Sequence, residues 1–307
     1  PIAAEIDESE EFPMGTVKKM GKYGMMGMPF PKEYEGAGTD YLTYIMAVEE
    51  LAKACGTTSV ILSAHTSLCA GPIFEFGTKE QKQKYLPDLL SGRKIGAFGL
   101  TEPNAGTDAS GQQSQAVKNG DYYILNGSKI FITNGGVADT FVIFAMTDRI
   151  LGTKGISAFI IEKGMPGFSI GKIENKMGIR ASSTTELIFE DVKVPAENML
   201  GKEGKGFGIA MKTLDGGRIG IAAQALGIAE GALDHAVAYM KERKQFGKPL
   251  SAFQGLQWYT AEMKVKVEAA KLLVYKAAWN KQQGKPYSVE AAEAKLFAAE
   301  TAMAVTT

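Results

Sequence analysis

The stretch with the most groups that could bind a ligand is residues 99–111, which read GLTEPNAGTDASG. It follows a short apolar run, residues 95–98, that predicts a buried strand, and its many turn-forming residues predict a loop. Gly106 lets the backbone approach a ligand closely, and the hydroxyls of Thr101 and Thr107 lie nearby in the sequence. The stretch therefore fits a site for a flat or anionic ligand, and it also fits an ordinary corner between a strand and a loop.

A second stretch, residues 214–219, reads LDGGRI within a predicted helix. Its paired glycines, Gly216 and Gly217, lower the stability of the helix by roughly 2 kcal/mol relative to two alanines. A helix that keeps such glycines usually has something close to its backbone. Arg218 adds a charge that needs a partner if it is buried. The pattern fits either a helix–helix contact or a ligand lying against the helix.

The composition excludes several classes of protein. The 307-residue chain has 34 Lys and Arg and 34 Asp and Glu, so its net charge is zero, which argues against nucleic acid or an anionic membrane as the main partner. No apolar run approaches the ~20 residues of a spanning helix, and the first residues lack a signal-peptide core. Cys55 and Cys69 are far apart and are expected to be reduced. His65 and His235 have no cluster of ligands beside them, so no metal site is expected.

The elements that must position these stretches fall into three regions. Apolar spacing predicts helices over residues 41–51, 59–69 and 79–90, the last capped by Gly77-Thr78. Short β-branched and aromatic runs predict strands over 122–125, 129–133, 141–146, 156–161 and 185–189, with turns at Asn126-Gly127 and Asn134-Gly135. Helical periodicity returns over 207–241, 253–283 and 289–307. We therefore predict an α+β multidomain protein with an N-terminal helical domain (1–92), a middle β-barrel or sandwich domain (93–205) and a C-terminal helix bundle (206–307).

Residues 99–111 resemble, over thirteen positions without a gap, the flavin-binding signature of the acyl-CoA dehydrogenase family. The order of helices, β domain and helix bundle is also the layout of that family, and the chain looks most like the bacterial short-chain, butyryl-CoA type. The resemblance implies FAD-dependent conversion of an acyl-CoA thioester to the trans-2-enoyl-CoA. In that reaction the α-proton leaves as H⁺ and the β-hydrogen leaves as hydride to flavin N5.

The same resemblance implies two segments that hold the flavin. Backbone and hydroxyl groups of the first would bind the isoalloxazine ring and the pyrophosphate, and donors on the pyrimidine side would stabilise the negative charge of the reduced ring. In the second, Phe131 would cover one face of the ring and the Thr133 hydroxyl would reach N5. Many family members have Trp at this position, and without the resemblance Phe131 would be interpreted as a core aromatic. The implied cofactor residues are Phe98, Leu100, Thr101, Gly106, Thr107, Phe131, Ile132 and Thr133.

Substrate binding is implied for Thr107, Asp215, Gly216, Gly217 and Arg218. The isovaleryl and long-chain branches carry their catalytic Glu just before the Arg of this helix, and Gly217 stands there in this chain. The short- and medium-chain branches use a Glu in a C-terminal Tyr-Glu-Gly segment, which residues 1–307 lack. We therefore assign no catalytic base, expect it in a missing C-terminal segment, and expect the chain as given, truncated at both ends, to bind FAD without turnover. Glu102 and Asp108 are interpreted as structural acceptors.

Residues 242–247, ERKQFG, match the family's Arg-x-x-Phe-Gly turn. The match implies that Arg243 and Gln254 reach the FAD diphosphate and adenosine of a neighbouring subunit, because an Arg fork pairs well with a pyrophosphate. A solvated surface Arg is the alternative. The implied partners are acyl-CoA, an electron-transfer flavoprotein and further copies of the chain in a dimer of dimers, in the cytoplasm. Two other functions stay open, namely an acyl-CoA oxidase that uses oxygen and a non-catalytic scaffold that binds flavin or CoA.

Overall fold

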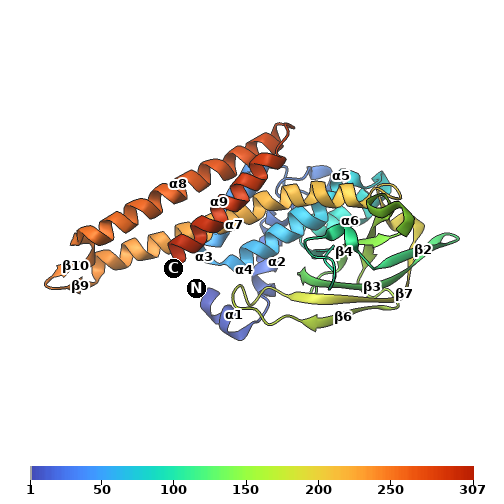
Figure 1. Ribbon diagram of the computed structural model, residues 1–307, viewed down its shortest axis with the longest axis horizontal. Coiled ribbons are helices and arrows are strands. Elements are labelled where there is room, and N and C mark those ends of the chain that lie inside the picture. The colour runs from blue at the N-terminus through green and yellow to red at the C-terminus, as the bar shows by residue number, and fades with distance from the viewer. Residues whose placement is uncertain (1) are drawn as a thin grey trace. The chain divides into compact units, whose positions relative to one another are not determined.

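The computed structural model describes residues 2–307 (Figure 1). They form two compact units, each built from segments that are distant in the sequence. The first unit comprises the chain up to Thr39 together with Ile61–Gly217, and the second comprises Asp40–Val60 together with Arg218–Thr307. The first holds a large sheet and several helices, and the second is almost entirely helical. The predicted α+β architecture is therefore confirmed.

The first unit contains several α-helices, and the start of the last of them is set by a local capping motif in the sequence. They are α1 (Ala3–Ser9), α2 (Met14–Lys22), α5 (Gly71–Phe76) and α6 (Lys79–Leu90). The Thr78 hydroxyl accepts from Gln81 N–H at 3.2 Å, and Gln81 Oε1 accepts from Thr78 N–H at 3.0 Å. This reciprocal capping box satisfies two donors that the first turn would otherwise leave unpaired.

The helix predicted over residues 59–69 contains an unexpected wide turn. The α-helix α4 (Gly56–Ser63) continues directly into η3, a π-helical segment at Ala64–Ala70. Within η3 the fully buried His65 accepts a hydrogen bond from Gly96 N–H at Nδ1 (3.0 Å), which leaves the ring proton on Nε2 to be donated to Leu89 O (3.1 Å). Burial lowers the pKa of His65 to about 4. The neutral ring thus joins η3 to the end of α6 and the start of β1.

Because His65 is neutral in the folded protein, we expect the free energy of unfolding to fall as the pH is lowered. The unfolded chain binds a proton near pH 6.5, whereas the folded chain binds it only near pH 4, so stability is lost progressively between these values. At pH 5 the free energy of unfolding is lower by about 2 kcal/mol, because each pH unit below 6.5 lowers it by about 1.4 kcal/mol. Urea unfolding of the wild type and of His65→Gln at pH 7 and pH 5 measures it. An equal decrease in both proteins would contradict the prediction.

Within residues 2–307, one sheet of eight strands lies at the centre of the first unit. Its strands are β1 (Gly96–Gly99), β2 (Gln115–Asn119), β3 (Tyr122–Thr133), β4 (Thr140–Met146), β5 (Ile156–Glu162), β6 (Phe168–Ile173), β7 (Thr184–Pro195) and β8 (Met199–Leu200). The spatial order is β6-β7-β3-β2-β4-β5-β8, and β1 pairs in parallel with β4. Side chains of β4 and β5, including Val142, Phe144 and Ile160, pack in one apolar core with Leu86 and Leu89 of α6.

Strand β3 corrects one prediction from the sequence. A turn is predicted at Asn126-Gly127, but β3 runs through this point as one strand of 12 residues. Gly127 has a φ of 138°, and the register against β7 shifts between Leu125 and Gly127. A Cβ on Gly127 would lie 2.7 Å from Ser114 Cα. The turn prediction is therefore wrong, because this glycine forms a bulge that permits a close backbone approach within the sheet.

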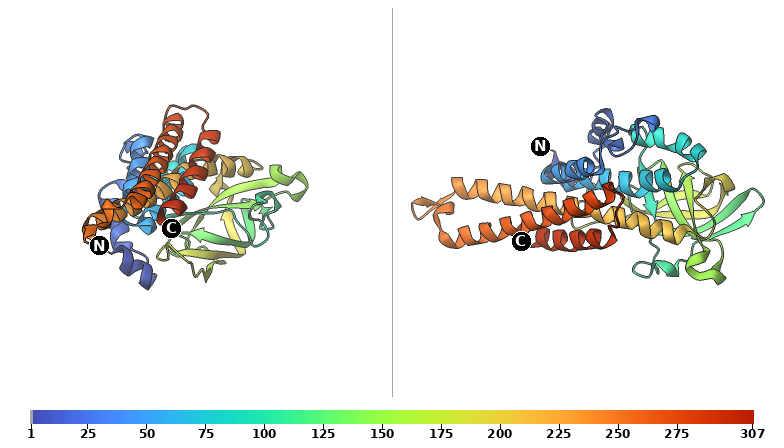
Figure 2. Two further views of the ribbon diagram at one scale, coloured as in Figure 1. Left: turned by 60° about the vertical axis from the view of Figure 1, so that its left-hand side comes forward. Right: turned by 90° about the horizontal axis from the view of Figure 1, so that it is seen from above.

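The second unit contains the long helices predicted for the C-terminal third of the chain. Its helices are α3 (Tyr41–Ala54), most of α7 (Gly206–Glu242), α8 (Gln254–Gln282) and α9 (Ser288–Thr306), and a short hairpin is formed by β9 (Lys244–Gln245) and β10 (Lys248–Pro249). Helices α8 and α9 lie side by side (Figure 2). Among residues 2–307, no helix combines the length and the apolar character needed to cross a bilayer.

Buried charges connect three helices of the second unit. Lys271 on α8 contacts Glu49 on α3 at 3.0 Å and Glu230 on α7 at 2.5 Å, and Lys53 contacts Glu230 at 3.0 Å. Tyr275 Oη donates to Glu49 at 2.8 Å. Burial raises the pKa of Glu49. Because the two ammonium groups neutralise the two buried carboxylates, we interpret the group as a structural cross-link.

Candidate functional site

The loop after β1 is held against β3 by its backbone carbonyls. Lys129 Nζ donates to Leu100 O at 3.2 Å, and Ile130 N–H donates to Thr101 O at 2.9 Å. Glu102 and Ala105 exchange two backbone hydrogen bonds of 3.1 Å, which close a tight turn. The backbone of residues 100–105 is therefore fixed before any ligand binds.

Beneath this loop lies an ion pair that the sequence analysis missed. Lys129 is fully buried and its Nζ lies 2.7 Å from Glu102 Oε1, which is itself almost fully buried. Glu102 also accepts from the N–H groups of Gln113 (2.5 Å) and Ser114 (3.1 Å), so it is a structural acceptor as predicted. Burial opposes ionisation of Glu102, but Lys129 and these donors hold its pKa below the usual value. Burial lowers the pKa of Lys129 to about 8. The signal available in the sequence was a lysine at the start of the predicted strand of residues 129–133, directly before Ile130, Phe131 and Ile132.

Phe131 is presented by a second irregularity in β3. Its φ is 59°, and pairing with β7 shifts register between Lys129 and Ile132. Regular pairing resumes at Ile132 and Thr133, opposite Thr185 and Thr184. A bulky residue in the left-handed region is strained by roughly 1–3 kcal/mol and such strain clusters at ligand sites. The residue is 59% exposed, so the interpretation of Phe131 as a core aromatic is wrong.

The remaining predicted cofactor residues differ in what they can present. Phe98 packs against Phe144 with ring centroids 5.0 Å apart, and Leu100 is buried, so their side chains serve the packing of the protein and only their backbones could contact a ligand. Gly106 and Thr107 are exposed, and a Cβ on Gly106 would meet nothing within 4 Å. The protein's own packing therefore does not require a glycine at 106.

The paired glycines of α7 lie where a neighbouring segment approaches. Gly216 and Gly217 are buried, and a Cβ on Gly217 would lie 2.8 Å from Leu68 Cδ2 in the π-helical segment η3. Asp215 and Arg218 are half-buried and both interact within the chain. The helix–helix contact considered for this stretch is thus present. Within the first unit, it brings η3 against Gly217 and leaves no room for a larger side chain there.

Arg243 and Gln254 are both exposed in the second unit. The backbone of Arg243 is fixed, because its N–H donates to Tyr239 O at 2.9 Å and its carbonyl accepts from Leu250 N–H at 2.8 Å. The β9–β10 turn that follows carries Phe246 in the left-handed region with its ring in solvent. Both side chains of the predicted pair are therefore available to bind a ligand.

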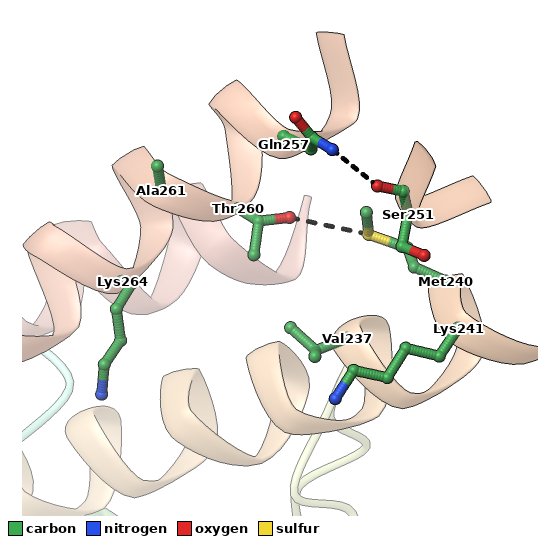
Figure 3. Close-up of a pocket in the computed structure, with 8 residues that line it drawn as sticks. All are labelled: Val237, Met240, Lys241, Ser251, Gln257, Thr260, Ala261 and Lys264. Carbon is green, nitrogen blue, oxygen red and sulfur yellow. Dashed lines mark hydrogen bonds between the residues drawn. The ribbon is translucent and has the colours of Figure 1, made fainter. Parts of the chain in front are cut away.

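A separate pocket of ≈ 380 Å³ lies in the second unit between α7 and α8 (Figure 3). It is lined by Val237, Met240, Lys241, Ser251, Gln257, Thr260, Ala261 and Lys264. Two polar groups of its wall already donate hydrogen bonds, Gln257 to Ser251 O at 2.8 Å and Thr260 to Met240 Sδ at 3.6 Å. None of the predicted ligand residues lines this pocket, so we assign it no part in the reaction.

Comparison with protein families identifies the chain. Residues 1–93 match the acyl-CoA dehydrogenase N-terminal domain, residues 97–192 the middle domain and residues 204–307 the C-terminal domain. The chain belongs to the acyl-CoA dehydrogenase family. As a member of that family it is an FAD-dependent oxidoreductase.

Several members of the acyl-CoA dehydrogenase family are closely similar to the chain. The short-chain specific acyl-CoA dehydrogenase of Clostridium acetobutylicum is 75% identical over 307 residues, which cover 100% of this chain and 81% of that protein. The structure of butyryl-CoA dehydrogenase from Megasphaera elsdenii matches with a TM-score of 0.98 and 58% identity over 99% of this chain and 81% of the other. A structure described as the electron transferring flavoprotein of Acidaminococcus fermentans matches with a TM-score of 0.98 and 62% identity, over 99% of this chain and 80% of that one.

The residues of the first unit fit the flavin that this acyl-CoA dehydrogenase requires. An exposed aromatic face at Phe131 suits a flat heterocycle. Thr101 N–H has no acceptor among the hydrogen bonds of residues 2–307, and it belongs to a backbone already oriented by β3. The Thr133 hydroxyl lies at the end of the same strand as Phe131. A ring and a hydroxyl on β3 and a free backbone donor on the loop after β1 are thus held by two segments that hydrogen-bond to each other.

Proposed function

We propose that this chain catalyses the FAD-dependent α,β-dehydrogenation of a short-chain acyl-CoA thioester and passes the electrons to an electron-transfer flavoprotein. The observation that carries the proposal is the exposed, strained Phe131 beside the anchored loop of residues 99–111. High identity to a short-chain enzyme supports the substrate class, and the likeness to the Acidaminococcus structure supports the electron acceptor.

The proposed roles of the residues follow from what each can present. FAD supplies the hydride acceptor when it is bound. Phe131 covers one face of its ring, the Thr133 hydroxyl is directed to N5, and the backbone from Phe98 to Thr101 serves the pyrimidine side. Gly106 and Thr107 give space and a hydroxyl for the pyrophosphate, and Ile132 fixes the strand between the two contact residues.

We propose that the acyl-CoA binds against Asp215, Gly216, Gly217 and Arg218 of α7 and touches Thr107. Because Leu68 already packs against Gly217, we expect the ester to reach this turn of α7 through the half-buried Asp215 and Arg218. No catalytic base is assigned among residues 2–307. The roles proposed for individual residues of this chain are therefore the binding and orientation of both ligands.

Arg243 and Gln254 are proposed to reach the FAD of a neighbouring subunit, because both are exposed and Arg243 has a rigid backbone. This arrangement makes each flavin site depend on a second copy, in agreement with a homo-oligomer arranged as a dimer of dimers. We further propose a cytoplasmic location and a division into domains at residues 1–92, 93–205 and 206–307.

Removing the Phe131 ring is expected to weaken FAD binding about fivefold, because stacking of an aromatic pair contributes about 1 kcal/mol beyond buried area. Phe131→Trp is the matched control, since it keeps a stacking face at the same backbone position. Titration of the apoprotein with FAD, followed by flavin fluorescence, measures both affinities. Equal affinities of Phe131→Ala and wild type would contradict the placement of the ring.

The reaction class is tested without requiring turnover. We expect butyryl-CoA and crotonyl-CoA to perturb the visible spectrum of the FAD-loaded protein, and we expect photoreduced flavin to reduce an electron-transfer flavoprotein faster than it reduces oxygen. Peroxide as the main product under air would favour the oxidase instead. A spectrum that neither ester changes, with FAD bound, would overturn the proposal.

A further inference from the structure

The ammonium group of Lys129 has a complete set of acceptors inside the protein. Its three N–H bonds are matched by Glu102 Oε1 at 2.7 Å, Gln112 Oε1 at 2.9 Å and Leu100 O at 3.2 Å. Glu102 balances the charge and is itself held by two backbone donors. Lys129 lies in β3 and Glu102 in the loop after β1, and replacing such buried pairs by apolar residues is often neutral or stabilising. The presence of this pair therefore calls for a reason other than stability.

The contact with Leu100 O has a directional consequence. In a trans peptide the carbonyl and the following N–H point in opposite directions, so Thr101 N–H points away from Lys129. The carbonyl oxygen of Thr101 itself is also held by β3, because it accepts a hydrogen bond from Ile130 N–H at 2.9 Å. Both carbonyls that flank Thr101 are therefore fixed, and its N–H is left to donate outward.

We propose that Lys129 is a positioning residue that tunes the flavin through the Leu100–Thr101 peptide: its charge, applied to Leu100 O, fixes and strengthens Thr101 N–H as a donor to the pyrimidine side of the ring. The inference rests on the flavin placement proposed above. A hydrogen bond at the carbonyl polarises the peptide and makes its N–H a better donor, and hydrogen bonds to charged groups are the stronger ones. Because reduction adds negative charge on that side of the ring, the arrangement favours reduced over oxidised FAD.

The test compares two double variants. Lys129→Met with Glu102→Gln removes the buried charges without leaving either partner ionised and unpaired. The control, Lys84→Met with Glu162→Gln, removes a half-exposed pair of 2.8 Å in the same unit. The readout is the ratio of reduced to oxidised flavin at equilibrium with a reference dye. We expect about a tenfold lower ratio in the first variant and no change in the control.

Several outcomes would overturn the inference. A ratio within twofold of wild type in the first variant, with FAD bound, would mean that Lys129 only supports the fold. If FAD is held weakly, the affinities for its reduced and oxidised forms are measured separately, because their quotient gives the same quantity by linkage. Equal loss of both affinities, or no binding of either form, would also overturn it. If instead Phe131→Trp and Phe131→Ala both left flavin binding and spectrum unchanged, the flavin placement itself would fail.

Discussion

Lys129→Met is expected to lower the free energy of unfolding by about 3–5 kcal/mol at pH 7, because it leaves an ionised carboxylate buried without its cation. Glu102 is almost fully buried, and the two backbone donors that remain do not carry a charge. Denaturation by guanidinium chloride at pH 7, with FAD present in equal excess, measures the change.

Two companion variants isolate the cause of that loss. Adding Glu102→Gln to Lys129→Met should recover most of the stability, since replacing both partners is often close to neutral. Lys84→Met removes one member of a half-exposed pair and should cost no more than about 1 kcal/mol. If Lys129→Met were no more destabilising than Lys84→Met, the buried pair would not be ionised in the folded protein.

Gly217→Val is expected to weaken binding of crotonyl-CoA by about tenfold to a hundredfold. The Cβ of a side chain at this position would lie 2.8 Å from Leu68 Cδ2. Forcing extra methyl groups into a packed site costs about 1–3 kcal/mol. We expect this crowding to disturb the turn of α7 against which the ester is proposed to bind. Spectral titration of the FAD-loaded variant with crotonyl-CoA gives the dissociation constant.

The smaller substitution Gly217→Ala separates packing from binding. Alanine in place of glycine stabilises the helix by about 1 kcal/mol, and this gain offsets the cost of crowding Leu68. The free energy of unfolding should therefore stay close to that of the wild type, while the affinity for the ester falls. FAD affinity should be unaffected in both variants. Unchanged ester binding by Gly217→Val would show that this glycine serves only the contact between α7 and η3.

The sequence predicted the features whose causes are local. The start of α6 was readable because Thr78 and Gln81 cap the helix within one turn. The long helices α7, α8 and α9 were readable because their apolar periodicity persists over many turns. The loop of residues 99–111 could be recognised because its turn formers and hydroxyls are contiguous.

The features that were missed depend on partners far away in the chain. An Asn-Gly pair marks a turn or a bulge equally well, and only the approach of Ser114 made Gly127 a bulge within β3. Lys129 could not be assigned because its acceptors, Leu100 and Glu102, lie 29 and 27 residues earlier. The exposure of Phe131 likewise results from its left-handed backbone, which the residue type itself disfavours.

The left-handed backbone at Phe131 sets two selection pressures against each other. Glycine or asparagine would relax that backbone, whereas only an aromatic side chain offers a face for a ring. A mutant library screened for heat resistance alone should therefore drift away from aromatic residues at this position. The same library screened for retained yellow colour should return to them.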